Sequence, residues 1–201
     1  MITEFLAAHW LDMVTTVLGL AYIILEYKAS LWMWLAGFLM QALGIVLYYQ
    51  KGLYADCGME FYYLAMTVYG YWKWVSKSPI GDDRGQNKSL AITHFPKKAI
   101  GYWLLITGVI WAVIYWLLVT FTNSNVPVAD SFTTALSIVG IWALAHKYLE
   151  QWFVWIAVDA VTCILYFYKD IPFKASLYGL YVIIAVAGYW KWRRMMQADA
   201  K

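Results

Sequence analysis

The sequence predicts an all-α integral membrane protein whose chain crosses the bilayer seven times. Hydrophobic residues make up 63% of the 201 residues and charged residues only 13%, a balance far from that of soluble domains. The chain also holds 13 Trp and 17 Tyr, the amphipathic aromatic residues that gather at membrane–water interfaces. Its apolar runs are continuous and about twice the length of the strands in a transmembrane barrel. Helices are therefore expected to span the membrane.

Seven segments approach the roughly 20 apolar residues that a membrane-spanning helix needs. They cover residues 11–28, 31–50, 57–75, 99–121, 131–149, 151–168 and 175–192. Asp12 and Asp130, each followed by two threonines, are expected to cap the N-termini of the first and fifth segments, because a carboxylate accepts hydrogen bonds from the free backbone N–H groups there. The break from Ser76 to Lys98 is rich in Pro, Gly and charge, which predicts a solvated loop.

The basic residues predict the orientation of the chain. With the N-terminus outside, 12 of the 15 Lys and Arg residues fall on the cytoplasmic side, and only Lys51, Lys169 and Lys174 fall outside. This is the positive-inside bias, so the C-terminus is expected in the cytoplasm. The first residues, MITEFLAAHW, lack a basic stretch followed by a cleavable apolar region, so no signal peptide is expected.

The chain contains an internal repeat with a period of 118 residues. Residues 12–74 align without a gap to 130–192, with 18 of 63 pairs identical, including Trp34 with Trp152. The pentapeptide GYWKW occurs in both copies, at 70–74 and 188–192. An ungapped register of this length indicates a duplicated structural unit.

The repeat predicts a 3+1+3 arrangement. Each copy holds three helices, and the single helix between them makes the two copies parallel, as in SWEET-type transporters. The expected parts are an N-terminal segment (1–10), a first three-helix repeat (11–75), a cytoplasmic loop (76–98), a linking helix (99–121), a second repeat (130–194) and a C-terminal tail (195–201). Both GYWKW segments then end a helix at the cytoplasmic interface. Their rings are expected to anchor at headgroup level, with Lys73 and Lys191 extending to water.

Among the carboxylates inside predicted spans two stand out, because an ionisable residue within a membrane indicates function when its burial costs a few kcal/mol or more. Asp159 lies near the middle of the sixth span and is the repeat equivalent of Gln41 in the second; Glu60 lies in the third. Helical spacing places Trp152, Trp155 and Asp159 on one stripe. Tyr63 and Thr67 share a stripe with Glu60 in the same way. Carboxylates framed by aromatic rings indicate a site for a flat organic cation.

Other interpretations of these residues stay open. Asp159 could be a protonated residue that bridges two helices, and Glu60 could face water near the membrane boundary. The chain lacks the HExxH and GxSxG motifs and any pairing of Cys or His at metal-ligand spacing, so neither an enzyme nor a metal or cofactor site is predicted. Cys57 and Cys163 are expected to act as small apolar residues. A net charge of +3 does not suggest a nucleic-acid partner. A carrier for an organic cation fits these observations best.

Two stretches, LYADCGMEFYYLAMTVYGYWKW and LEQWFVWIAVDAVTCILYF, resemble the Pnu family of bacterial vitamin transporters. The resemblance covers essentially the whole chain, in helix number and in repeat order. It implies a location in the bacterial inner membrane and facilitated diffusion, with two three-helix bundles rocking around a central site. It also implies a homotrimer and a cytoplasmic kinase that traps the arriving vitamin by phosphorylation.

The resemblance also implies a set of substrate-binding residues: Gln41, Glu60, Tyr63, Thr67, Tyr69, Gln151, Trp152, Trp155 and Asp159. Nicotinamide riboside carriers of this family resemble this chain but have amides where Glu60 and Asp159 stand. The exchange of two amides for two acids resembles the thiamine-transporting branch, so thiamine is the expected substrate. Nicotinamide riboside carried by the same mechanism is one alternative. A proton- or sodium-coupled carrier that uses Asp159 as its coupling site is another.

Overall fold

The computed structural model describes residue 14 and residues 17–50, 54–76, 90–122, 124–168 and 172–199. Within these ranges the chain is all-helical apart from a single isolated β-bridge. The helices fall into two compact units, which divide between Leu90 and Ala91. Asp12 lies outside the described residues, so its predicted role as a helix cap stays a prediction.

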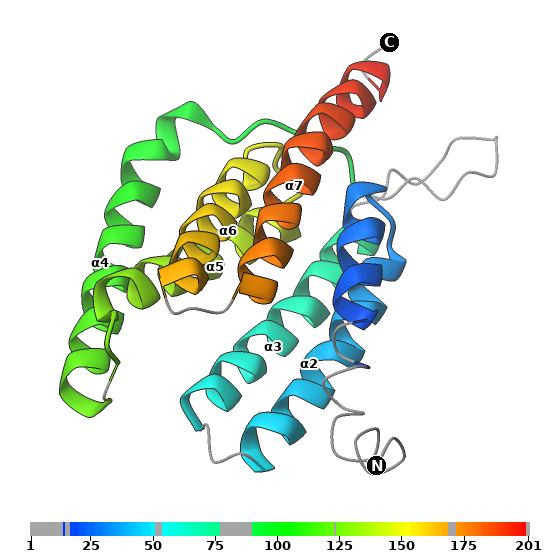
Figure 1. Ribbon diagram of the computed structural model, residues 1–201. Coiled ribbons are helices and arrows are strands. Elements are labelled where there is room, and N and C mark those ends of the chain that lie inside the picture. The colour runs from blue at the N-terminus through cyan, green and yellow to red at the C-terminus, as the bar shows by residue number, and fades with distance from the viewer. Residues whose placement is uncertain are drawn as a thin grey trace. The chain divides into compact units, whose positions relative to one another are not determined.

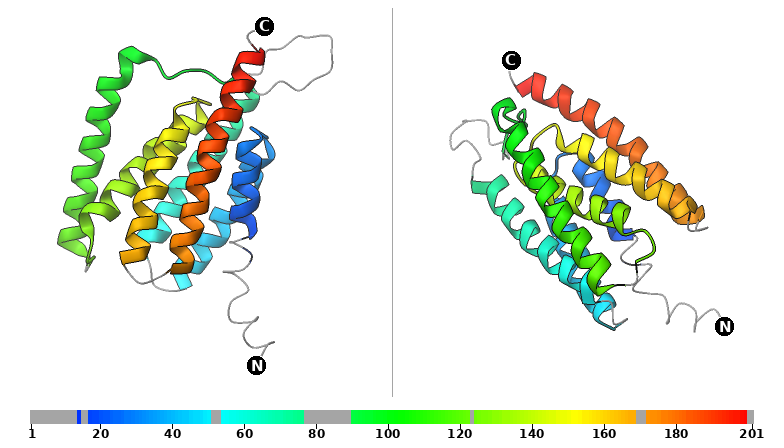
Figure 2. Two further views of the ribbon diagram at one scale, coloured as in Figure 1. Left: turned by 45° about the horizontal axis from the view of Figure 1, so that its top comes forward. Right: turned by 90° about the vertical axis from the view of Figure 1, so that its left-hand side faces the viewer.

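The first unit contains three helices. They are the helix Val17–Tyr27, α2 (Trp32–Gln50) and α3 (Tyr54–Ser76), and α2 packs along α3 (Figure 1). The second unit begins with a 3-10 turn at Lys97–Ala99 and continues with α4 (Ile100–Phe121), α5 (Pro127–Ala145), α6 (Gln151–Tyr168) and α7 (Pro172–Asp199). In this unit α5 packs against both α4 and α6, and α6 packs against α7 (Figure 2).

Each of the seven predicted spans coincides with a helix over most of the residues that the structure describes, and the predicted limits of 151–168 are confirmed at α6. Four of the described helical segments are long and apolar enough to cross a membrane: α2, Lys97–Phe121, α5 and α6. The helix Val17–Tyr27 is apolar but shorter. The chain thus has the composition and the long apolar helices of a multi-pass membrane protein.

The fifth helix differs from its predicted limits of 131–149. It begins four residues earlier because Pro127, whose fixed φ suits the first helical turn, occupies that turn. It ends at Ala145 because Lys147 adopts a positive φ of 57°. Asp130 is therefore not the helix cap: the capping position is Val126, and the Asp130 carboxylate instead accepts a hydrogen bond from the Ser124 hydroxyl, 2.8 Å away.

The two copies of the repeat close their first inter-helix turn in the same way. Ala29 has a positive φ of 51° and is the repeat equivalent of Lys147. In the first unit the N–H of Ala29 donates to the Glu26 carbonyl at 2.8 Å, and the next N–H donates to the Leu25 carbonyl at 3.0 Å. The bonds from Lys147 and Tyr148 repeat this pattern 118 residues later, at 2.8 and 3.1 Å. This is the Schellman termination of a helix, formed at both positions without glycine.

The GYWKW segments pack into the interior of each unit, which corrects part of their predicted role as interfacial anchors. Trp74, which ends the first segment, is fully buried and meets the ring of Trp34 edge-on at 5.4 Å between centroids. Trp192 and Trp152 repeat this contact at 5.5 Å. Lys73 is buried too, and its Nζ donates to the Tyr69 hydroxyl at 3.3 Å rather than extending to water.

Only the outward-facing rings of these segments remain available as anchors. Tyr71 and Trp72 of the first segment, and Trp190 of the second, are more than half exposed. The repeated pentapeptide therefore combines an interior Gly and Trp with exterior rings. The buried Gly and Trp explain why the pentapeptide occurs in both repeats, and its exposed rings keep their predicted role as anchors at the membrane interface.

Candidate functional site

The first two turns of α6 carry a run of buried polar groups. Gln151 is fully buried, and neither its amide nitrogen nor its amide oxygen has a hydrogen-bond partner among the residues that the structure describes. The indole N–H groups of Trp152 and Trp155 are likewise buried without a partner in those ranges. Buried polar atoms usually find partners, so three such side chains on one helix indicate a place where a ligand could supply them.

Asp159 lies one turn further along α6 and is only 7% exposed. It lies near enough to Tyr181 of α7 for the two groups to interact electrostatically. Tyr181 belongs to a group of rings on α6 and α7, in which it meets Tyr178 edge-on at 5.6 Å and Tyr178 stacks on Tyr166 at 5.4 Å. The carboxylate predicted at membrane depth is therefore buried, and it interacts with a tyrosine of α7 that belongs to this group of rings.

Close helix contacts fix the two tryptophans of α6. The ring of Trp155 lies over Gly140 of α5, where a methyl group would sit 3.3 Å from the ring. The ring of Trp152 lies over Gly188 of α7, where a methyl group would sit only 2.5 Å from it. Both rings therefore serve packing within the second unit, and the glycines opposite them make room for that packing.

In the first unit, the predicted polar residues lie on α2 and α3. Gln41 of α2 is 8% exposed and Thr67 of α3 is 3% exposed. The carboxyl group of Glu60 lies against Gly44 of α2, where a methyl group would sit 2.9 Å from the carboxyl carbon. Gly44 thus permits an acidic side chain to lie in the contact between two helices.

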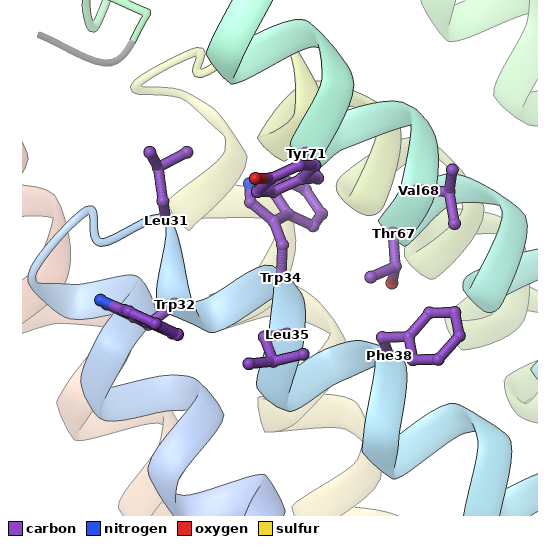
Figure 3. Close-up of a pocket in the computed structure, with 8 residues that line it drawn as sticks. All are labelled: Leu31, Trp32, Trp34, Leu35, Phe38, Thr67, Val68 and Tyr71. Atoms are coloured by element: carbon purple, nitrogen blue, oxygen red, sulfur yellow. The ribbon is translucent and has the colours of Figure 1, made fainter. Parts of the chain in front are cut away.

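A pocket with a volume of about 470 Å³ opens beside Thr67 (Figure 3). It is lined by residues of α2, of the turn before it and of α3: Leu31, Trp32, Trp34, Leu35, Phe38, Thr67, Val68 and Tyr71. The indole N–H of Trp34 is buried and has no hydrogen-bond partner among the described residues. The pocket therefore joins an aromatic wall with a hydroxyl and an indole.

At the corresponding place in the second unit, two aromatic rings meet. Phe153 and Tyr189, the repeat equivalents of Leu35 and Tyr71, bring their rings to within 4.7 Å between centroids. Ala185 stands where Thr67 stands in the first unit. The surroundings of this pocket thus differ between the repeats, because the second has two rings in contact there and a methyl group in place of the hydroxyl.

The remaining predicted residues, Tyr63 and Tyr69, are partly exposed on α3. Tyr63 meets Tyr62 edge-on at 5.7 Å, and Tyr69 contacts Trp72 and Lys73. Within each unit the structure therefore groups most of the nine predicted residues. Glu60 and Thr67 of α3 lie against α2, Gln41 is buried on α2, and Gln151, Trp152, Trp155 and Asp159 lie along α6.

Two features of these surroundings are not predicted from the sequence. Trp34 is conspicuous there only as a repeated residue, and its place in the pocket wall has no sequence signal. Glu150, just before α6, accepts hydrogen bonds from the backbone N–H of Phe95 at 2.8 Å and from His94 at 2.7 Å. No sequence signal connects residues 94 and 150. Across the part of the chain that the structure describes, no group of three His, Cys, Asp or Glu side chains could hold a metal ion.

Comparison with known proteins identifies relatives over nearly the whole chain. The model of the family described as nicotinamide mononucleotide transporter matches residues 9–194. The riboflavin/roseoflavin transporter RibM of Streptomyces davaonensis is 26% identical over 195 residues, which cover 96% of this chain and 88% of RibM. The nicotinamide riboside transporter PnuC of Neisseria mucosa is 24% identical over 199 residues, covering 94% of this chain and 73% of that protein.

A crystal structure of a PnuC protein, described as a vitamin B3 transporter, has the same fold. It superposes with a TM-score of 0.75 and 22% sequence identity, covering 98% of this chain and 86% of that one.

Proposed function

This chain belongs to the nicotinamide mononucleotide transporter family, and from that premise we propose that it carries thiamine, a small aromatic cation, across the bacterial inner membrane. Relatives of the chain named PnuC and RibM are transporters of vitamins. The protein is accordingly a multi-pass vitamin transporter of the inner membrane and not an enzyme. The identity of the vitamin, the residues that bind it and the mode of transport are the proposal.

The observation that carries the proposal is the pair of carboxylates within the helices. Asp159 of α6 is buried and interacts with Tyr181 of α7, and Glu60 lies in the contact between α2 and α3. Such groups are costly within a bilayer and are kept where they pair with a substrate or another charge. The thiazolium of thiamine supplies a positive charge, and its aminopyrimidine supplies hydrogen-bonding groups that a carboxyl group can pair with.

Aromatic and amide groups supply the rest of the proposed recognition. Trp155 and Tyr63 offer ring faces for stacking and cation–π attraction. The unpartnered amide of Gln151 offers a donor and an acceptor in a fully buried position. Thr67 offers a hydroxyl at the edge of a pocket with aromatic walls. Together with Gln41, Tyr69 and Trp152, these are the proposed binding residues.

We propose facilitated diffusion as the mode of transport. The two compact units, each built on one copy of the repeat, would alternate the access to the site. A cytoplasmic kinase that phosphorylates the vitamin would keep its free concentration low and so maintain the inward gradient. Assembly as a homotrimer belongs to the same proposal.

Calorimetric titration of the purified protein in detergent tests the substrate. We expect thiamine to bind and nicotinamide riboside and riboflavin to give no heat at the same concentrations. Binding of riboside with no response to thiamine would keep the family and reject the proposed vitamin. Binding of riboflavin alone would indicate that the chain carries the vitamin for which RibM is named, and would reject thiamine.

Amide variants of the two acids test the proposed site. Glu60→Gln and Asp159→Asn keep the shape of the side chain and remove the charge, so each should weaken thiamine binding by about 1–3 kcal/mol, which is about 5–150-fold in Kd. Glu26→Gln is the matched control, because Glu26 is a buried acid in the helix Val17–Tyr27 outside the proposed site. An unchanged Kd in both site variants would reject the assignment.

A coupled carrier is the second candidate, favoured by the single buried carboxylate at the middle of α6. In proteoliposomes that contain thiamine inside and outside, exchange without an ion gradient supports facilitated diffusion. A requirement for a proton or sodium gradient that is lost in Asp159→Asn would support coupling through this residue instead.

A further inference from the structure

The segment just before the 3-10 turn is attached to the turn between α5 and α6. The N–H of Thr93 donates to the carbonyl of Lys147 at 3.2 Å, and the carbonyl of Thr93 accepts from the N–H of Leu149 at 2.9 Å. These two bonds form the isolated parallel bridge between Thr93 and Tyr148. The extended segment that precedes α4 is visible in Figure 2.

Glu150 completes this attachment with both oxygens of its carboxylate. One oxygen accepts the backbone N–H of Phe95 at 2.8 Å, and the other lies 2.7 Å from Nδ1 of His94. The ring of Phe95 also packs edge-on against Tyr148 and Trp142, with centroids 5.2 and 6.4 Å apart. We call the contacts of Thr93, His94 and Phe95 with residues 147–150 the clasp.

On the other side of this segment, the chain is attached to the first unit. The N–H of Leu90 donates to the carbonyl of Trp74, near the end of α3, at 3.1 Å. Between this bond and the first bond of the clasp lie only Ala91 and Ile92. Three steps between consecutive Cα atoms, from Leu90 to Thr93, span at most about 11 Å. The division into compact units falls within this link.

We propose that Glu150 is a positioning residue of the transport cycle, which clamps Thr93–Phe95 to the α5–α6 turn and so confines the backbone link between the two units to Ala91 and Ile92. Without the clasp, the free link would extend from Leu90 to the 3-10 turn at Lys97, seven steps that reach about 25 Å. The proposal rests on the proposed function, because a short link matters only if the two units move relative to one another.

The clasp also lies next to the proposed site and is restricted to one repeat. Glu150 immediately precedes Gln151 and Trp152, so the same turn that holds the link begins the helix with the buried polar run. The repeat equivalent of Glu150 is Trp32, whose side chain is exposed. The backbone N–H of Trp32 donates to the hydroxyl of the neighbouring Ser30. A difference between repeats at this position fits a role in linking them.

Distances between spin labels in the two units test the proposal without any substrate. Cysteines replace the exposed Leu39 of α2 and Phe167 of α6 in a protein whose Cys57 and Cys163 are changed to alanine. Pulsed electron–electron double resonance then measures the distance between the two labels. Labelled protein is diluted with unlabelled protein, so that only distances within one chain are reported. Glu150→Ala removes two of the four hydrogen bonds of the clasp and leaves the two backbone bonds of Thr93. It should therefore broaden the distance distribution, by at most about twofold, since the link reaches about 11 Å with the clasp closed and about 25 Å with it open.

One insertion tests the link independently of Glu150, and a second insertion and a conservative variant serve as controls. Two glycines inserted between Ala91 and Ile92 should broaden the distribution while leaving Glu150 in place, so this variant tests the link even if Glu150→Ala fails to fold. The same insertion between Gly85 and Gln86 should have no effect, because it lies before the Leu90–Trp74 bond. Glu150→Gln keeps an acceptor for the Phe95 N–H and should stay close to wild type.

Uptake and binding then connect the clasp to function. In Glu150→Ala we expect the maximal uptake rate to change at least about fivefold with the thiamine Kd within about twofold, since a positioning residue acts on the conformational step. An unchanged distance distribution, in a variant whose Phe95 amide exchanges faster with deuterium, would overturn the proposal. Absence of thiamine binding in the wild type would reject the proposed function, while the distance measurement would still decide the role of the clasp.

Discussion

The two units of this protein agree most closely where side chains pack and least where polar groups are buried. The edge-on contact of Trp34 with Trp74 recurs as Trp152 with Trp192, with interplanar angles of 90° and 88°. The Schellman turns at Ala29 and Lys147 repeat each other bond for bond. Duplication has therefore preserved the contacts that set the distance and angle between helices.

At two places the units keep a contact but exchange its partners. In the first unit the ring of Tyr22 lies over Gly37 of α2; in the second, the ring of Trp155 on α6 lies over Gly140, the equivalent of Tyr22. The aromatic side chain thus comes from opposite helices and fills the same space. The fold therefore requires that the space between these helices is filled, and either helix can carry the side chain that fills it.

Polar positions differ without any such exchange. Gln41 corresponds to Asp159, Glu60 to Tyr178, Thr67 to Ala185 and Trp32 to Glu150. These positions are therefore the ones to test for separate roles of the two repeats.

The largest expected effect comes from breaking the shared Gly–Trp packing. A methyl group at Gly188 would lie 2.5 Å from the Trp152 ring, and one at Gly70 would lie closer still to Trp34. The rings are buried on both sides, so they cannot move away. Gly70→Ala and Gly188→Ala should each lower stability by about 3 kcal/mol, the upper end of the usual cost of overpacking. Thermal unfolding in detergent measures the effect.

Matched glycines on the same helices provide the controls for this prediction. A methyl group at Gly58 of α3 would meet no atom within 4 Å, and one at Gly179 of α7 would make an ordinary contact of 3.7 Å with Cys163. Gly58→Ala and Gly179→Ala should unfold at or slightly above the wild-type temperature. If the variants at Gly70 and Gly188 unfold like these controls, the glycines do not serve the Trp contact.

The second prediction exchanges the polar residues of the two repeats. The double variant Gln41→Asp with Asp159→Gln keeps one carboxylate but moves it to the first unit. If Asp159 has a role of its own, thiamine binding should fall by about 1–2 kcal/mol, the cost of leaving a buried partner group unsatisfied. Calorimetric titration measures this, with thermal unfolding as the control for folding. Unchanged binding would mean that the two positions are equivalent.

Much of the fold could be predicted from the sequence because its determinants are local or repeated. The length and hydropathy of the apolar runs predicted the helices, and the ungapped repeat predicted that the units are built alike. The limits of the fifth helix were wrong because the positive φ of Lys147 has no sequence signal: glycine, the usual residue there, is absent. The burial of Trp74 could not be predicted either, because an aromatic residue near a helix end suits an interface equally well.

The candidate site could be predicted only as a list of residue types. Intramembrane carboxylates stand out in any apolar helix, so Glu60 and Asp159 were found directly. The contact of Glu60 with Gly44 and the clasp at Glu150 depend on which helices lie side by side, which a single sequence does not give. The repeat offered one unused signal: the pairing of Gly70 with Gly188 and of Trp34 with Trp152 already suggested that each glycine serves a ring.

The smallest expected effect on stability concerns the second place at which the two units keep a contact but exchange its partners. This contact is made by the two cysteines. Cys57 of α3 donates its thiol to the carbonyl of Ile45 on α2 at 3.6 Å. Cys163 of α6 donates to the carbonyl of Ala175 on α7 at 3.1 Å, although Cys163 is the equivalent of Ile45 and Ala175 that of Cys57. The same two positions thus carry one thiol in each unit, on opposite helices.

A double-mutant cycle in the second unit tests whether this exchange is real compensation. Cys163→Ile with Ala175→Cys copies the arrangement of the first unit, with a larger side chain on α6 and the thiol on α7. Each single change loses a contact or overfills the space, so the double variant should be more stable than the sum of the singles by about 0.5 kcal/mol, the lower range for residues in contact. Unfolding midpoints of the four proteins give this coupling. A coupling of zero would mean that the two thiols do not serve the same contact. An exchange of partners between the repeats would then be limited to the rings over Gly37 and Gly140.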